Sequence, residues 1–340
     1  MKILILKRDK IGDLLLTTPM LRHLRASLPD ARIHLLANDY NAWVVADNPD
    51  IDKLWVYRRA KVGRRIKPAA IFGQIWLNYR LRRERYDVVV VAGGDESARA
   101  IKRALRVGGK RTIAYCRDPR LAARLSDALP PPAGRHEADR MLGLLEPLGI
   151  RPPAAPILPG YDLPEEWKLQ ALEWLKQRAV TPGKYVVLGL GARRAKKQPT
   201  TAQILRWSAY FKASLGLDTV FMWTPGKSDN PLYPGDDDVA QPVLDANIPY
   251  IHPFRGPIMP ALGLIWQARI SIFPDSGLMH FAAASPGGVL GLFAETDVSP
   301  PPAQWGPRGR SADYLEAAKS VEELTDEQVF GKLGQFSNSR

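Results

Sequence analysis

Short apolar segments alternate with helical segments twice along this chain of 340 residues. In the first series, apolar runs typical of buried strands lie at 1–6, 31–37, 51–57 and 86–92. In the second series, comparable runs lie at 184–191, 219–223 and 269–273. Helical spacing of apolar residues occupies the intervals. Strands that alternate with helices predict an α/β fold with parallel sheets.

A proline-rich segment at 150–164 separates the two series. Its prolines are Pro152, Pro153, Pro156, Pro159 and Pro164. Prolines at this density are typical of a linker, so we expect one domain over 1–155 and another over 156–318. Residues 319–340 are expected to form a helix and tail that pack back on the first domain. Two α/β halves joined in this way imply a cleft between them.

The chain carries 48 Lys and Arg against 35 Asp and Glu, a net charge of +13. This excess favours an anionic partner: nucleic acid, an acidic or phosphorylated sugar, or an anionic membrane surface. A solvated basic surface is the alternative. The single cysteine excludes an internal disulfide and indicates a reducing compartment. No signal-peptide pattern and no membrane-spanning run is evident, so we expect a cytoplasmic protein.

Asp13 follows the first expected strand, after a turn over residues 7–12 that contains Gly12. Ligands of parallel α/β sheets bind beyond the carboxyl ends of the strands, which is where this acid is expected. An acid there can cap the next helix, bind a ligand hydroxyl or a metal, or act as a general base. The residue alone does not decide among these roles.

The segment 58–67 carries six cations and no acid. Its cations are Arg58, Arg59, Lys61, Arg64, Arg65 and Lys67. A solvated loop or helix face is one interpretation, and a clamp for an anionic substrate is the other. Nucleic acid is a third candidate. It has weak support because no stacking aromatics interrupt the cations.

Two further segments carry candidate chemistry. Residues 273–284 predict a strand that ends before a helix of small residues, and such a helix start favours a phosphate. An ordinary turn with an Asp or Ser cap is the alternative. The segment 189–199 lacks both the dinucleotide fingerprint and the phosphate-loop pattern, but it places four cations after a strand. We interpret Asp236, Asp237 and Asp238 as a solvated turn rather than a metal site, and His136 as a local polar contact.

Three of these stretches together resemble glycosyltransferase family 9, the lipopolysaccharide heptosyltransferases. They are Ile-Gly-Asp-Leu at 11–14, Lys-Lys-Gln-Pro at 196–199 and Asp-Ser-Gly-Leu-Met-His at 275–280. Residues 136–149, 291–293 and 305–307 add supporting matches. Their order and spacing extend the resemblance from residue 1 to about residue 330.

The resemblance implies a GT-B fold, in which two Rossmann-like domains with parallel sheets face a central cleft. The first domain would bind the acceptor and the second the nucleotide-sugar donor. The implied reaction is the inverting transfer of heptose from ADP-L-glycero-D-manno-heptose to the lipopolysaccharide inner core or a related anionic glycan. No metal and no cofactor is expected.

The resemblance also assigns roles to residues of this chain. Asp13 would be the catalytic base, and Lys196 would stabilise the pyrophosphate as the bond to the sugar breaks. The predicted donor-binding residues are Gly191, Asp275, Ser276, Gly277, Leu278 and His280. The predicted acceptor-binding residues are Gly12, Arg58, Arg59, Lys61, Arg64 and Arg65.

The implied partners are the donor, the anionic core acceptor and the inner face of the inner membrane, with peripheral contact and no nucleic acid. The chain departs from the family at Gln198, where a tryptophan is usual, and at Ala294–Glu295, where a glycine is usual. One alternative is therefore a family member that uses another nucleotide sugar. The alternative from another class is a non-catalytic nucleotide- or glycan-binding protein on the same fold.

Overall fold

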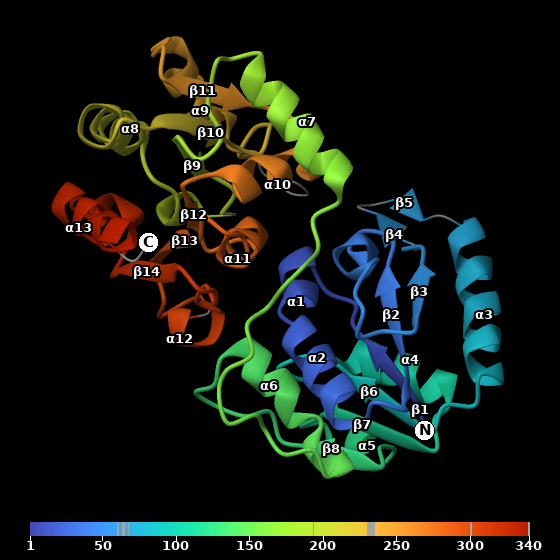
Figure 1. Cartoon of the computed structure of the whole chain (residues 1–340). Helices are drawn as coiled ribbons and strands as arrows, with labels where there is room; N and C mark the ends of the chain where they lie inside the picture. Colours follow the sequence, from blue (N-terminus) through green and yellow to red (C-terminus); the bar gives the residue numbers. More distant parts are fainter. Residues whose placement is uncertain are drawn as a thin grey trace. The chain divides into compact units, whose positions relative to one another are not determined.

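The computed structural model describes residues 1–59, 61–62, 65–66, 68–192, 194–229, 235–299 and 301–338. The chain divides into two compact units, Met1–Asp162 and Leu163–Arg340. The division falls a little after residue 155, within the proline-rich segment. Figure 1 shows that each unit contains a sheet with helices around it.

The first unit is built on a six-stranded parallel sheet in the order β3-β2-β1-β6-β7-β8. Its strands are β1 (Lys2–Leu6), β2 (Arg32–Asn38), β3 (Lys53–Tyr57), β6 (Val88–Val91), β7 (Arg111–Tyr115) and β8 (Asp127–Leu129). Its helices are α1 (Ile11–Leu15), α2 (Thr18–Ser27), α3 (Pro68–Arg83), α4 (Ala98–Val107), α5 (Pro119–Ala122) and α6 (Glu137–Gly143), with 3-10 turns at Ala42–Val45 and Glu146–Leu148. Central strands that are buried along their length explain the continuous apolar runs of β1 and β6.

The second unit repeats this architecture in the order β11-β10-β9-β12-β13-β14. Its strands are β9 (Tyr185–Gly189), β10 (Asp218–Met222), β11 (Ile251–Phe254), β12 (Ile270–Pro274), β13 (Val289–Ala294) and β14 (Ala312–Ala317). Its helices are α7 (Glu165–Lys176), α8 (Thr201–Leu215), α9 (Asp237–Asp245), α10 (Ile258–Gln267), α11 (Gly277–Ala283), α12 (Pro302–Trp305) and α13 (Asp326–Asn338), with 3-10 turns η3 (Ala195–Lys197) and η4 (Val321–Glu323). The predicted α/β class with two parallel sheets is confirmed.

Local signals explain where the helices begin and end. Helix α8 begins with a capping box, in which the Gln203 N–H donates to Thr200 Oγ1 and the Thr200 N–H donates to Gln203 Oε1. It ends at Gly216, and α4 ends at Gly108, both in the left-handed region at φ +65° and +75°. Helix α3 carries apolar side chains on both its buried and its exposed faces.

The C-terminal segment contributes to the second unit, and the expectation that residues 319–340 also pack back on the first domain stays a prediction. Residues 312–317 form β14 at the edge of the second sheet, and α13 places Val329 and Leu333 in the apolar core of the second unit. Asp326 fixes the start of α13, since it accepts hydrogen bonds from Arg206 and from the indole N–H of Trp207. An apolar helix stripe packs where complementary apolar surface lies, and α8 supplies that surface here.

Candidate functional site

In each sheet the sequence order of the strands changes direction beside the first strand of that unit. In the first unit the reversal lies between β1 and β6, and in the second it lies between β9 and β12. Ligands of open parallel sheets bind beyond the carboxyl ends of the strands at such a reversal. Gly12 and Asp13 follow β1, Gly191 follows β9, and residues 275–280 follow β12. The fold therefore positions most of the predicted site residues at the two places where it favours ligands.

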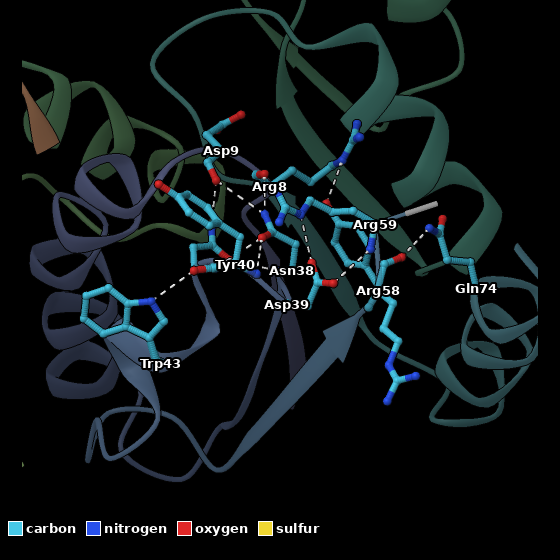
Figure 2. Close-up of polar contacts among 11 residues, drawn as sticks. Arg8, Asp9, Asn38, Asp39, Tyr40, Trp43, Arg58, Arg59 and Gln74 are labelled. Atoms are coloured by element: carbon cyan, nitrogen blue, oxygen red, sulfur yellow. Dashed lines mark hydrogen bonds and ion pairs between the residues drawn. The ribbon is translucent and has the colours of Figure 1, made fainter. Parts of the chain in front are cut away.

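The turn after β1 is held by two buried asparagines. Asn38 Nδ2 donates to the Arg8 carbonyl over 2.7 Å, and Asn41 Nδ2 donates to the Asp9 carbonyl over 2.9 Å (Figure 2). These bonds satisfy backbone oxygens that the turn leaves without strand partners. Sequence reasoning did not identify the asparagines, although an Asn directly after the apolar run of β2 was a usable signal.

Asp13 is half-buried on α1, and its Oδ2 accepts from the Lys10 backbone N–H over 3.0 Å. Within the described part of the chain this is the carboxylate's only hydrogen bond, so one acceptor oxygen is left for another ligand. Burial raises the pKa of Asp13 above its ordinary value, the Lys7 charge opposes this, and the carboxylates of Asp9 and Glu137 reinforce it.

Lys7 lies directly before this turn with 1% of its side chain exposed, and its Nζ is 3.1 Å from Asp9 Oδ2. Burial alone would lower the pKa of Lys7, but the carboxylates of Asp9, Asp13 and Glu137 outweigh burial and raise it. Lys7 is therefore a buried cation that balances the acids around it. Sequence reasoning gave Lys7 no role beyond its place in the turn after β1.

Glu137 connects the start of α6 to Gly94, which follows the carboxyl end of β6. Its buried carboxylate accepts from the Gly94 N–H over 2.8 Å, and a Cβ at Gly94 would lie 2.2 Å from Glu137 Oε2. Arg140 donates to the Gly94 carbonyl over 3.3 Å. His136 caps α6 by accepting from the Ala138 N–H over 3.2 Å, which confirms its interpretation as a local polar contact.

The basic segment forms a short antiparallel hairpin of β4 (Lys61–Val62) and β5 (Arg65–Ile66), not a helix face. Arg59 Nε is 2.9 Å from Asp39 Oδ1, and its guanidinium lies over the Tyr40 ring, 5.0 Å from the ring centroid. The exposed Arg58 side chain extends away from this network, while its carbonyl accepts from Gln74 over 2.6 Å (Figure 2). Arg64 and the side chains of Lys61 and Arg65 lie outside the described residues.

In the second unit an ion pair spans the strand reversal. Lys197 Nζ, on η3 after β9, lies 2.7 Å from Asp275 Oδ2, directly after β12, and 7% of the Lys197 side chain is exposed. The neighbouring Lys196, the predicted pyrophosphate ligand, is 66% exposed and lies 3.7 Å from Glu295 Oε1. Arg194 lies 3.6 Å from the other oxygen of Glu295. Sequence reasoning did not single out Lys197 or Glu295.

The predicted donor residues gather at the carboxyl ends of β9 and β12. Gly191 has a φ of +115°, a backbone conformation that favours glycine. Ser276 precedes α11 without capping it, and its buried Oγ has no hydrogen-bond partner among the described residues. Gly277 and Leu278 open the helix, and His280 is buried within it. The alternative of an ordinary turn capped by the Ser276 side chain is therefore not what the structure shows.

The acidic run after β10 is not the solvated turn that we expected. Asp236 is 5% exposed and accepts hydrogen bonds from the buried Gln198 amide and from the Thr224 N–H. Burial raises the pKa of Asp236 against the opposing effect of these hydrogen bonds. Asp237 accepts from the indole N–H of Trp223. These acids fold the loop before α9 onto the segment that carries Lys197.

No group of three or more His, Cys, Asp or Glu side chains among the described residues is arranged to hold a metal ion. No helix in that part of the chain is long and apolar enough to cross a membrane.

Comparison with known proteins agrees with this architecture. No family model matches the chain. Lipopolysaccharide heptosyltransferase 3 of Escherichia coli is 29% identical over 297 residues, which cover 84% of this chain and 81% of that protein. The crystal structure of a family 9 glycosyl transferase from Veillonella parvula superposes with a TM-score of 0.81 at 20% identity, over 100% of this chain and 97% of that one. The structure of E. coli ADP-heptose lps heptosyltransferase II superposes with a TM-score of 0.76 at 18% identity, over 100% and 99%.

Two parallel six-stranded sheets with alternating helices are the architecture of the GT-B glycosyltransferases, and this chain has that fold. Within this class, the curated relatives and the superposing structures are heptosyltransferases and a family 9 member. The resemblance to glycosyltransferase family 9 that the three motifs carry is thereby confirmed.

Proposed function

We propose that this protein is a glycosyltransferase of lipopolysaccharide synthesis that moves heptose from ADP-L-glycero-D-manno-heptose to the anionic inner core, with inversion at the anomeric carbon. The observation that carries the proposal is the half-buried Asp13 carboxylate, which lies at the strand reversal with one oxygen left for a ligand. Heptosyltransferase names among the relatives support the sugar and the pathway.

Asp13 acts as the general base of the proposed reaction. As the acceptor hydroxyl oxygen attacks the anomeric carbon, its proton passes to Asp13 and the bond from that carbon to the nucleoside diphosphate breaks. Its raised pKa suits this role, because a base works best when its pKa approaches the working pH. Gly12, the residue before Asp13, contacts the acceptor in this proposal.

The second unit binds the donor. Lys196 and Arg194 are exposed cations held only loosely by Glu295, so a pyrophosphate can replace the carboxylate and have its developing charge stabilised. Ser276, Gly277, Leu278 and His280 contact the diphosphate around the start of α11, and Gly191 lets the backbone approach it. Lys197 holds Asp275 in position toward the donor sugar.

The acceptor is an anionic glycan that the basic segment binds. Arg58 is exposed and its guanidinium is available to a phosphate or carboxylate, whereas Arg59 is already engaged by Asp39. Lys61, Arg64 and Arg65 extend the same charge along the sequence. We propose no metal, no further cofactor and no nucleic-acid partner, and a cytoplasmic protein at the inner face of the inner membrane.

Nucleotide binding is the first test. Calorimetric titration of the purified chain with ADP, UDP and GDP should show a clear preference for ADP. A preference for UDP or GDP would favour the alternative of a family member with another nucleotide sugar. If none of the three binds at millimolar concentration, the assignment of residues 275–280 to the donor is wrong.

Substitution of Asp13 separates an enzyme from a binding protein on the same fold. Asp13→Asn should reduce transfer from ADP-heptose by about 100-fold or more while ADP binding is unchanged. Because burial raises the pKa of Asp13, its ionised form does not favour folding at neutral pH, and the variant should not have a lower Tm. Asp30→Asn, at an exposed aspartate of the same unit, is the matched control. If the wild-type chain shows no transferase activity, the result would support the alternative of a non-catalytic binding protein.

A further inference from the structure

Helix α3 exposes a row of large apolar side chains to solvent. Phe72 is 72% exposed and Trp76 is 61% exposed. Ile71, Ile75 and Tyr79 are exposed beside them. Figure 1 shows α3 at the outer edge of the first unit, next to β3. An apolar patch of this kind on a folded protein marks a surface that binds another apolar surface.

The exposed residues lie on one face of the helix. Phe72, Ile75, Trp76 and Tyr79 have the spacing i, i+3, i+4 and i+7, which places them together along about two turns. The opposite face packs on the sheet through Ala70, Leu77 and Leu81. Since those three residues already attach α3 to its unit, the exposed face is not needed for packing within the described part of that unit.

Arginines border this face at the C-terminal end of the helix. Arg80, Arg82 and Arg83 lie in its last turn, and α3 contains no acidic residue. Arg80 and Arg83 lie over the rings of Trp76 and Tyr79, at 4.7 and 5.9 Å from the ring centroids. Glu84, the next residue, does not neutralise them, because its carboxylate oxygens lie 2.9 Å from Lys2 and from Lys53.

A groove extends the apolar face onto the edge strand of the sheet. It lies between α3 and β3, and Leu54, Val56, Gly73 and Trp76 are among the residues that line it. Arg58 and Arg80 also line it, so cations accompany the apolar surface here as well. The face and the groove together combine aromatic, aliphatic and cationic groups.

We propose that the exposed face of α3 docks on an anionic phospholipid bilayer, with its aromatic and aliphatic side chains between the headgroups and its arginines on the lipid phosphates. Apolar residues flanked by arginines are the composition of helices that lie in a membrane interface. A second copy of the chain fits the face less well, because in a symmetric contact through α3 the face meets itself and α3 offers no carboxylate to the arginines of the other copy. The inference gives a surface to the membrane contact of the proposed function, and it does not depend on the proposed transferase activity.

Vesicle sedimentation with the full chain tests the proposal. The wild-type chain should bind vesicles that contain phosphatidylglycerol and bind vesicles of phosphatidylcholine alone much more weakly, since the arginines require anionic headgroups. Phe72→Gln with Ile75→Gln should weaken binding to the anionic vesicles about tenfold or more. Both positions are exposed, so circular dichroism and Tm should stay as in the wild type.

The matched control is Leu169→Gln with Leu172→Gln, two exposed leucines of α7 in the other unit, which should leave vesicle binding unchanged. The proposal is overturned if the α3 variant binds as the wild type does, or if neutral and anionic vesicles bind equally. It is also overturned if the wild-type chain binds no vesicles and forms a dimer that the α3 variant dissociates. None of these readouts uses transferase activity, so a failure here removes the membrane contact from the proposed function and leaves the proposed transfer reaction standing.

Discussion

Lys197 and Asp275 form an ion pair of 2.7 Å that connects the segment after β9 to the segment after β12. The two residues are 78 positions apart in the sequence, and the strands that precede them flank the reversal of the second sheet. The pair thus places one cation and one anion at the position where this sheet is expected to bind a ligand. The pair also gives two adjacent lysines different environments, because the Lys197 side chain is buried in the pair and the Lys196 side chain remains at the surface.

Loss of the Lys197 charge should destabilise the second unit. Lys197→Met leaves the Asp275 carboxylate largely buried without its cation, which should lower the free energy of unfolding by about 3 kcal/mol. Lys196→Met removes a charge that is mostly exposed and should change stability by less than about 0.5 kcal/mol. Urea denaturation of the two variants makes the comparison. Equal effects would show that the buried pair does not stabilise the fold.

The pH profile of transfer should respond to Lys7. A carboxyl with a raised pKa takes up its proton at higher pH, so Asp13 is lost as a base when the pH falls through that raised value. The Lys7 charge lowers the pKa of Asp13, and Lys7→Met should therefore move the acid limb of kcat/KM to higher pH by about one pH unit. Lys10→Met, at an exposed lysine of the same turn, should leave the limb in place. An unmoved limb in the Lys7 variant would contradict the role of Asp13 as the base.

Gly94 should not tolerate a side chain. In Gly94→Ala the new Cβ would overlap the buried carboxylate of Glu137, which should lower the free energy of unfolding by about 2 kcal/mol. Gly93→Ala is the neighbouring control, because the nearest atom to its Cβ would be the Asp95 carbonyl oxygen at 3.6 Å. Thermal unfolding of both variants measures the difference. A Gly94 variant as stable as its control would mean that α6 does not pack against the end of β6 as described.

Glu295 combines an unfavourable backbone conformation with a charge near two cations. Its φ is +55°, so Glu295→Gly should be more stable than Glu295→Ala by about 1 kcal/mol. Both variants remove the carboxylate that lies near Arg194 and Lys196, so both should bind ADP about threefold more tightly. Calorimetry measures the affinity and thermal unfolding the stability. Weaker ADP binding in both variants would indicate that Glu295 itself contacts the donor.

Local patterns were sufficient where a structure depends on neighbours in the sequence. The apolar runs of β1, β6 and β9 predicted buried strands, because a strand covered on both faces must be apolar along its length. The strands β8, β11, β13 and β14 were missed, and the first two show why. Asp127–Leu129 is only half-buried, and Ile251–Phe254 contains a proline, so neither resembles a buried strand in the sequence.

Local patterns did not predict contacts between segments that are far apart in the sequence. Gln198 looked like a departure from the family motif, yet its amide is buried and bonds to Asp236, 38 positions further along the chain. Glu137 received no role from the sequence, yet it accepts from the Gly94 N–H, 43 positions earlier in the chain. In each case the order of strands in the sheet decides which residue is the partner. Residues that are close together in the sequence do not indicate that order.

The sequence by itself determined the alternation of strands and helices, the division into two α/β halves, and the acid and the cations that follow their first strands. Those features depend on periodicity and on turn residues, which act over a few positions. Only the tertiary structure decided that Lys197 rather than Lys196 pairs with Asp275, that Lys7 is buried among acids, and that α3 has an apolar face left in solvent. The physical reason is that burial and charge pairing depend on which surfaces meet when the sheet assembles.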